Sequence, residues 1–239
     1  MNKQEAKKLV VKHINSFFEK YDFKLQKKID STVVYQRKTK FGFDGFASGT
    51  VDYNPVQIIR YSFYKKINCI EEITVLVDKK VKLSPPIDKN TVSMAFGYGG
   101  VVLRKPVDTY LPECKTEDDI IDSVNKIIDF SIKHAFPLIE NADNLKFLDN
   151  EINGKYFWET DWQKKFNLGG NFNIKRLIIA KLAGNPSFDE IADRNYTAIE
   201  KASEESGYPF TYDRNDLSMP IPCVLDILKH IEPLKSPLA

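Results

Sequence analysis

The spacing of apolar residues along the chain changes from helical to strand-like and back to helical. Over residues 3–20 the apolar side chains recur every three or four positions, which places them on one face of a helix. That face carries Ala6, Val10, Ile14, Phe17 and Tyr21. We therefore predict an amphipathic helix over residues 3–20.

Residues 31–104 contain segments in which apolar and polar side chains alternate with a period of two. Such alternation, with many β-branched and aromatic residues, predicts strands. We assign strands to residues 31–38, 49–53, 56–66, 71–77, 92–96 and 101–104. Gly42, Gly45 and Gly49 are interpreted as turn or bulge positions. Because no helical pattern separates these strands, we expect a mainly antiparallel sheet.

After Pro112 the pattern becomes helical again. Thr116 and Asp119 have the spacing of a capping box, and the apolar stripe that follows runs to Phe136. Further helices are predicted over residues 138–152, 173–183, 187–206 and 222–231, with Gly154 and Gly184 as C-terminal caps. The predicted fold class is α+β, an N-terminal helix with a mainly antiparallel sheet followed by a helical C-terminal half. We divide it into an α+β domain, residues 1–155, and an aromatic loop with a helical region, residues 156–239.

The charge of the chain is close to balanced in total but not along its length. The 35 basic and 33 acidic residues give a net charge of +2. Residues 1–110 hold 20 Lys and Arg against 11 Asp and Glu, a net +9, and residues 111–239 hold 15 against 22, a net −7. Such asymmetry is typical of a protein-binding or nucleic-acid-binding half, and also of two halves that neutralise each other by packing together.

The sequence favours a cytoplasmic protein that does not insert into a membrane. Its first residues have no apolar signal core, and no apolar run approaches the roughly 18 residues that a membrane span needs. Cys69, Cys114 and Cys223 are far apart and form no CxxC pair, which is typical of reduced thiols rather than of a disulfide framework.

Two short motifs resemble a group of uncharacterised bacterial domain families. Residues 21–24 (YDFK) with Lys27 and Lys28 are similar to a GFKK-like segment that leads into strands, with Asp22 where those families have glycine. Residues 136–140 (FPLIE) are similar to the Pro-hydrophobic-acidic run that ends an acidic-capped helix. The resemblance covers roughly residues 1–155. Some of these families look like immunity proteins of bacterial toxin systems, so the resemblance implies binding to a protein partner.

No catalytic, metal-binding or cofactor-binding constellation is identified in the sequence. His13, His134 and His230 have no partner at the i, i+4 spacing that holds a metal, and His13 is interpreted as a packed, hydrogen-bonded side chain. There is no G-x-S-x-G nucleophile motif, and Cys114 is interpreted as an inert thiol. Residues 97–100 (GYGG) precede a strand-like segment, whereas a phosphate-binding loop precedes a helix. We nominate no catalytic residue, no metal and no cofactor, and the question of an enzyme stays open with the sequence favouring a non-enzyme.

Two aromatic segments point to binding. Residues 156–162 (YFWETDW) form an acidic, aromatic loop of the composition that anchors interfaces, with Trp158, Glu159, Asp161 and Trp162 as candidate partner-binding residues. The inward packing of both tryptophans is the structural alternative. The basic and aromatic segment 60–66 nominates Arg60, Tyr64, Lys65 and Lys66 for nucleic acid, although alternation predicts that half of this segment is core.

Three hypotheses about function follow. The leading one is a non-enzymatic cytosolic binding protein, immunity-like, that engages a protein partner through an acidic and aromatic C-terminal surface. The first alternative is an enzyme with a carboxylate and tyrosine site between sheet and helices. The second is nucleic-acid binding by the basic N-terminal half, which the sequence favours less than a protein partner.

Overall fold

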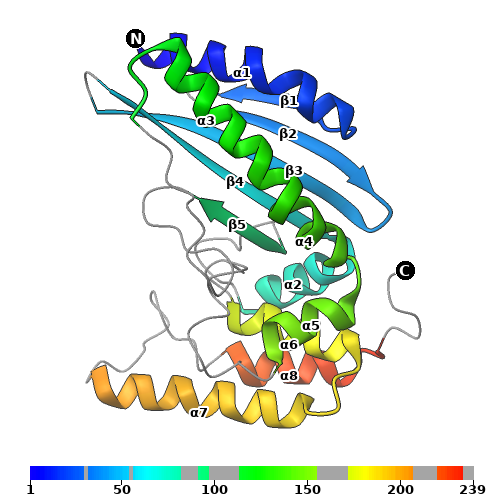
Figure 1. Cartoon of the computed structure of the whole chain (residues 1–239). Helices are drawn as coiled ribbons and strands as arrows, with labels where there is room; N and C mark the ends of the chain where they lie inside the picture. Colours follow the sequence, from blue (N-terminus) through cyan, green and yellow to red (C-terminus); the bar gives the residue numbers. More distant parts are fainter. Residues whose placement is uncertain are drawn as a thin grey trace. The chain divides into compact units, whose positions relative to one another are not determined.

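The computed structural model describes residues 1–29, 32–53, 56–81, 91–96, 113–154, 172–206 and 220–233 (Figure 1). It separates into two compact units that interleave along the chain. The sheet unit holds the described parts of Met1–Lys66 and Val92–Glu140. The helical unit holds the described parts of Ile67–Thr91, Asn141–Trp162 and Leu168–Ala239. The sequence-based division into residues 1–155 and 156–239 stays a prediction.

The sheet unit contains a five-stranded sheet with the strands in chain order. These strands are β1 (Lys24–Ile29), β2 (Thr32–Thr39), β3 (Gly42–Asp52), β4 (Gln57–Ile67) and β5 (Val92–Phe96). Strands β1 and β2, β2 and β3, and β4 and β5 pair antiparallel, which confirms the mainly antiparallel sheet and the α+β class. Strand β1 was not predicted, and the predicted strand at 101–104 lies outside the described residues.

Helix α1 (Lys3–Lys20) packs on one face of this sheet, beside α3 (Glu117–Phe130), as Figure 1 shows. Both helices begin at capping boxes, Asn2 with Glu5 and Thr116 with Asp119, so the predicted box at Thr116 is confirmed. The core between helices and sheet is aromatic. The ring of Phe18 lies 4.4 Å from that of Phe46 on β3, measured between centroids. This burial explains why the apolar face of residues 3–20 specifies the helix.

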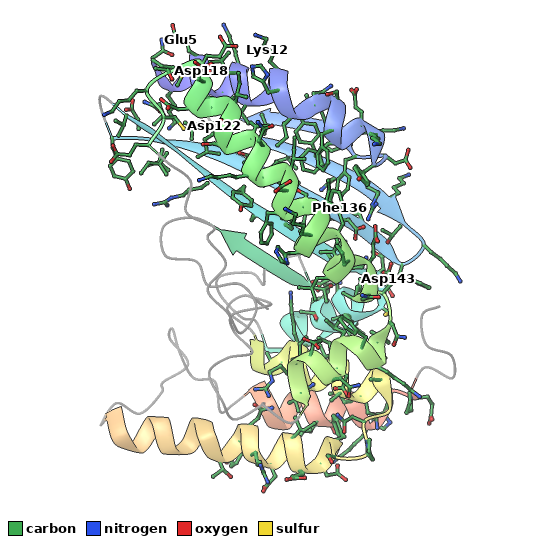
Figure 2. The ribbon with its side chains drawn as sticks, viewed as in Figure 1. Glu5, Lys12, Asp118, Asp122, Phe136 and Asp143 are labelled. Atoms are coloured by element: carbon green, nitrogen blue, oxygen red, sulfur yellow. The ribbon has the colours of Figure 1, made fainter. Side chains whose placement is uncertain are left out.

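A five-residue π-helix, η1 (Ser131–Ala135), joins α3 to α4 (Phe136–Asn141). The predicted apolar stripe therefore continues to Phe136, but through a wider turn that accommodates an extra residue. Phe136, labelled in Figure 2, stacks on Phe17 at 5.9 Å and on Phe23 at 5.6 Å between ring centroids. The predicted helix over 138–152 is in fact two helices, α4 and α5 (Leu145–Asn153), and Gly154 caps the second as predicted.

The predicted turn or bulge at Gly45 is wrong, because β3 runs unbroken from Gly42 to Asp52. A Cβ atom at Gly45 would overlap the ring of Tyr64 on the neighbouring strand. The glycine therefore allows a close approach of an aromatic ring to the backbone. At Asp22, by contrast, the backbone adopts φ 63°, a conformation that glycine adopts most readily.

The helical unit consists of α2 (Asn68–Val81), α5, α6 (Phe172–Ala183), α7 (Phe188–Ser206) and α8 (Pro220–Lys229). Helix α6 is its centre and packs against the other four. The strand predicted over residues 71–77 is wrong, because this segment belongs to α2. Ile70, Ile73, Thr74 and Val77 are buried at helical spacing, and their packing overrides the strand preference of their β-branched side chains.

Candidate functional site: a charged pocket between three helices

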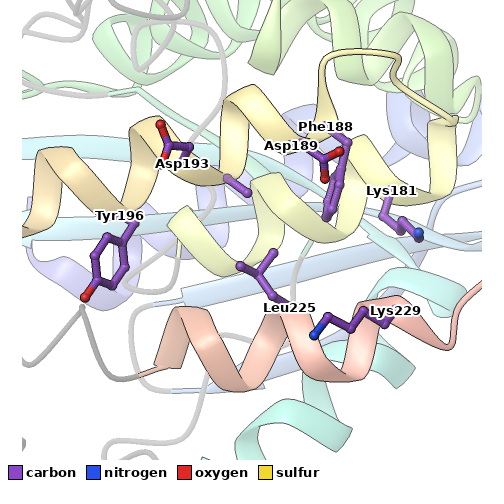
Figure 3. A pocket seen from close by; sticks show the side chains of 8 residues that line it. Lys181, Phe188, Asp189, Asp193, Tyr196, Leu225 and Lys229 are labelled. Atoms are coloured by element: carbon purple, nitrogen blue, oxygen red, sulfur yellow. The ribbon is translucent and has the colours of Figure 1, made fainter.

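A pocket of about 420 Å³ lies between α6, α7 and α8 of the helical unit (Figure 3). Its apolar lining comes from Phe188 and Ala192 on α7 and from Leu225 on α8. A volume of this size and an apolar lining with a few polar groups are typical of ligand-binding pockets. Tyr196 adds an aromatic side chain, and this residue is 37% exposed.

The turn between α6 and α7 brings the pocket residues together. Gly184 adopts φ 66°, as a C-terminal cap requires, and the Asn185 N–H donates to the Ala180 carbonyl at 3.0 Å. The chain therefore reverses sharply, and α7 starts beside the end of α6. Phe188, Ala192 and Tyr196 follow each other at i, i+4 and i+8, so they share one face of α7.

Four charged side chains line the same pocket, two of each sign. Lys181 lies in the last turn of α6 and Lys229 is the last residue of α8, while Asp189 and Asp193 lie one turn apart on α7. The Lys181 Nζ lies 5.4 Å from the centroid of the Phe188 ring, within the range of a cation–π contact. The pocket therefore combines apolar walls with balanced charge.

The two aspartates repel each other. Like charges at i, i+4 on a helix destabilise it by about 0.2–0.5 kcal/mol. Within the described part of the chain, neither carboxylate accepts a side-chain hydrogen bond or pairs with a cation. Glu190, on another side of α7, is instead paired with Arg194. Asp189 and Asp193 are thus two carboxylates available to a ligand.

The candidate partner-binding residues predicted from sequence, Trp158, Glu159, Asp161 and Trp162, lie outside the described residues. That prediction stays a prediction. The pocket residues were not predicted, although one signal was present, since Phe188, Asp189, Ala192, Asp193 and Tyr196 recur at helical spacing within 187–206. Their convergence with Lys181 and Leu225 depends on tertiary packing that spacing alone does not show.

The residues nominated for nucleic acid fall on both faces of β4. Arg60, Tyr64 and Lys66 share the face opposite α1 and α3, and Lys65 lies on the helix-covered face. Arg60 is exposed, and the Lys66 Nζ lies 5.9 Å from the ring centroid of Phe43 on β3. Tyr64 is buried, and its hydroxyl accepts a hydrogen bond from Gln36. The structure therefore brings Arg60 and Lys66 to one face and separates Lys65 from them, as alternation predicted for half of the segment.

Lys65 belongs to a buried ionic network at the end of the aromatic core. Its Nζ is 2.7 Å from Asp44 Oδ1, and Arg37 Nη2 is 2.8 Å from Asp44 Oδ2. Arg37 also pairs with Glu140 at 3.0 Å. Asp44 is thus the buried carboxylate that both cations contact, while the Glu140 side chain is 55% exposed.

The first alternative hypothesis placed an enzyme site between the sheet and the helices. In the sheet unit, this space is packed with aromatic rings. Burial raises the pKa of the Tyr35 hydroxyl to about 12, and it also raises the pKa of Tyr61. Both phenols are therefore protonated at neutral pH. The Tyr35 hydroxyl donates to Asn15 at 3.2 Å, and the carboxylate of Asp44 is held by its two cations.

A second set of buried charges lies on α6. Lys175 is fully buried, with its Nζ 3.3 Å from Glu71 Oε1 of α2. Arg176 donates from Nε to Asn153 Oδ1 of α5 at 3.1 Å. Burial lowers the pKa of Arg176 and raises the pKa of Asp149, which accepts hydrogen bonds from Asn153 and Asn185. These contacts fix α6, which forms one wall of the pocket.

Among the described residues, the thiols of Cys69 and Cys114 are not activated by their surroundings. Burial raises the pKa of the Cys114 thiol, which contacts Ser123 Oγ at 3.4 Å, and it raises that of Cys69. The His13 ring lies 3.1 Å from Glu117 Oε1, so His13 is partly packed and hydrogen-bonded as predicted. Among the described residues, no group of three or more His, Cys, Asp or Glu is arranged to hold a metal ion. In the same part of the chain, no helix has the length and apolar character needed to cross a bilayer.

Comparisons of the chain with protein-family models, with curated proteins and with solved structures return no match.

Proposed function

We propose that this chain is a non-enzymatic, cytosolic binding protein that engages a protein partner through an acidic and aromatic surface of its C-terminal half, in the way that immunity proteins bind toxins. The pocket between α6, α7 and α8 is the observation that carries this proposal. It presents Phe188, Tyr196 and Leu225 beside exposed carboxylates. Aromatic anchors with a polar rim are the composition of protein interfaces.

The charge of α7 supports the same proposal. Residues Phe188–Ser206 contain six Asp and Glu against two Lys and Arg, so 2 − 6 gives a net charge of −4. An acidic helix of this kind attracts a basic partner surface and raises the rate of encounter. The loop with Trp158, Glu159, Asp161 and Trp162 remains a second proposed part of this surface.

Capture of the partner from the organism that encodes the chain tests the proposal. We expect the full chain to retain one protein in stoichiometric amount, and we expect Tyr196→Ala to lose it. Trp158→Ala and Trp162→Ala test the proposed loop in the same way. Glu190→Gln is the matched control, because it alters α7 away from the pocket. Absence of any stoichiometric protein, or equal capture by every variant, would contradict the proposed surface.

A second function is favoured by one observation, the exposed Arg60 on the same sheet face as Lys66 and Phe43. Basic and aromatic side chains on a sheet can contact phosphates and bases. Retention on immobilised nucleic acid that falls steeply with salt, and that Arg60→Gln weakens, would support this function. No retention at low salt would rule it out.

A further inference from the structure

The charges of the pocket are separated along its length. Figure 3 shows Lys181 and Lys229 toward one end and Asp193 and Tyr196 toward the other, with Leu225 between them. Asp189 lies one turn of α7 from Asp193, on the side of the lysines. The lysine end therefore carries two positive charges and one negative charge, and the Asp193 end carries one negative charge, so a ligand of a single sign of charge is repelled at one end. A ligand with opposite charges at its two ends is attracted at both.

The length of the pocket sets the size of that ligand. Phe188 and Tyr196 are eight residues apart on α7, which at 1.5 Å per residue separates them by about 12 Å along the helix axis. An extended peptide advances about 3.3 Å per residue, so three to four residues span this distance. The apolar lining between the charged ends would contact the central side chains of such a segment.

Asp193, which lies farther from the lysines and is repelled by Asp189, marks the end where the cation binds. A Lys or Arg side chain beside Asp193 would relieve this repulsion, and its charged head would also lie near the exposed ring of Tyr196. At the other end, an Asp or Glu side chain would lie near Lys181 and Lys229. The aliphatic part of a lysine or arginine side chain can pack against the apolar lining of the pocket while its charged group stays at the rim.

We propose that the pocket binds an extended segment of three to four residues in the partner protein, with a basic residue at one end, an acidic residue at the other and aliphatic residues between. The assignment of the segment to a partner rests on the proposed function, while the charge order follows from the pocket alone. Affinity comes from the aliphatic centre, and orientation comes from the two charged ends.

Titration of the full-length chain with blocked peptides tests the charge order. The probe is acetyl-Lys-Leu-Leu-Glu-amide, and the comparison peptide, acetyl-Leu-Lys-Glu-Leu-amide, has the same composition in another order. We expect the probe to bind about three- to tenfold more tightly, which corresponds to about one well-placed ion pair. Amide resonances of Phe188, Tyr196 and Leu225 are expected to shift. Equal affinity for the two peptides would overturn the proposal.

A variant with reversed charge preference distinguishes the loss of a specific pocket contact from the loss of folding. Asp193→Lys should weaken binding of the probe and should strengthen binding of acetyl-Glu-Leu-Leu-Glu-amide, a gain that an unfolded protein does not show. Glu190→Gln should leave both affinities unchanged. If Asp193→Lys leaves the preference unchanged, the proposal is wrong.

Two further outcomes identify another occupant and overturn the peptide assignment. One is binding of free lysine as tight as that of the probe, which indicates a small zwitterion. The other is a dimer of the chain that the probe dissociates, which indicates a second copy. Failure of the proposed function alone gives a different result. The probe peptide would still bind more tightly than the comparison peptide, but no partner protein would be captured. Capture that persists when the probe fills the pocket overturns this inference alone.

Discussion

At the scale of single residues, Asp44 is the group on which a buried ionic network depends. Its two carboxylate oxygens face Lys65 and Arg37, and Lys65 has no exposed surface. A buried cation is tolerated because a carboxylate at hydrogen-bond distance replaces its lost hydration. The sequence shows Lys65 only as one of several basic residues on a strand, so its burial depends on contacts that no local pattern reveals.

Replacement of Asp44 should therefore destabilise the protein strongly. Asp44→Asn keeps the shape of the side chain but replaces the buried carboxylate that contacts both Lys65 and Arg37 with a neutral amide, and we expect a loss of about 3–5 kcal/mol in the free energy of unfolding. Urea denaturation followed by circular dichroism measures it. Asp122→Asn, at an exposed position of α3, is the control and should change stability by less than about 0.5 kcal/mol. A similar small effect at Asp44 would show that the ionic contacts of its carboxylate contribute little to stability.

Glu117 provides a prediction on pH. Its carboxylate is 2.8 Å from Lys12 Nζ and 3.1 Å from His13 Nε2, and these hydrogen bonds, that of Lys12 first, hold the pKa of Glu117 below its ordinary value of 4.5. A folded-state pKa below the unfolded one means that the carboxylate stabilises the fold above the unfolded value. That contribution is lost as the pH falls through the folded-state pKa.

Glu117→Gln should accordingly lower the melting temperature at neutral pH and low salt, and the difference from the wild type should vanish on acidification below the folded-state pKa. The contact is exposed, so high salt should also reduce the difference. Asp118→Asn is the matched control, because Asp118 is exposed in the same turn of α3 and, among the described residues, forms no ion pair with α1. A difference that persists at low pH would contradict an ionic origin.

At the scale of elements, the sequence predicted those helices and strands whose pattern agrees with their packing. The helix over residues 3–20 has one apolar face and a cap at each end, and it forms as predicted. Residues 71–77 carry two patterns, a strand-like alternation and the helical spacing of Ile70, Ile73 and Val77. Only burial distinguishes them, and burial selects the helix. A glycine in the sequence is ambiguous in the same way, because it can mark a turn or a close contact. Gly45 does not form a turn but leaves room for the ring of Tyr64.

The π-helix η1 leads to a prediction about deletions. Its wide turn holds one residue more than an α-turn, and Lys133 within it is 62% exposed at the side chain. Deletion of Lys133 should convert the π-turn to an α-turn and keep Phe136 in the core. We expect a cooperatively folding protein with a loss within about 2 kcal/mol. Thermal unfolding and the dispersion of amide resonances measure the result.

Deletion of Lys126, an exposed residue in the regular part of α3, is the control. There the deletion rotates every later residue by about 100° around the helix axis, so Ile127 and Phe130 would leave the core. This variant should lose cooperative unfolding. If both deletions are equally damaging, removal of the extra residue of η1 does not restore a regular α-helix that keeps Phe136 in the core, and the prediction is wrong.

At the scale of the whole molecule, the candidate site was less predictable than the fold. The pocket combines Lys181, Tyr196 and Leu225 from three helices, and its charge balance of two lysines and two aspartates is hidden within a half of the chain that is acidic overall. Local periodicity predicts which residues share the face of one helix, but it contains no information on which helices meet. The pocket was therefore visible only once α6, α7 and α8 were placed together.

The interleaving of the two units has a consequence for synthesis. Helix α2 emerges from the ribosome between the two parts of the sheet unit, but the α6 that covers it begins about 90 residues later. At ordinary translation rates this takes about 5–20 s. During that interval the apolar face of Ile70, Ile73 and Val77 has no α6 to pack against. Slow or stalled translation beyond α2 would prolong the exposure of this face, so the yield of folded protein should depend on codon choice between residues 82 and 172.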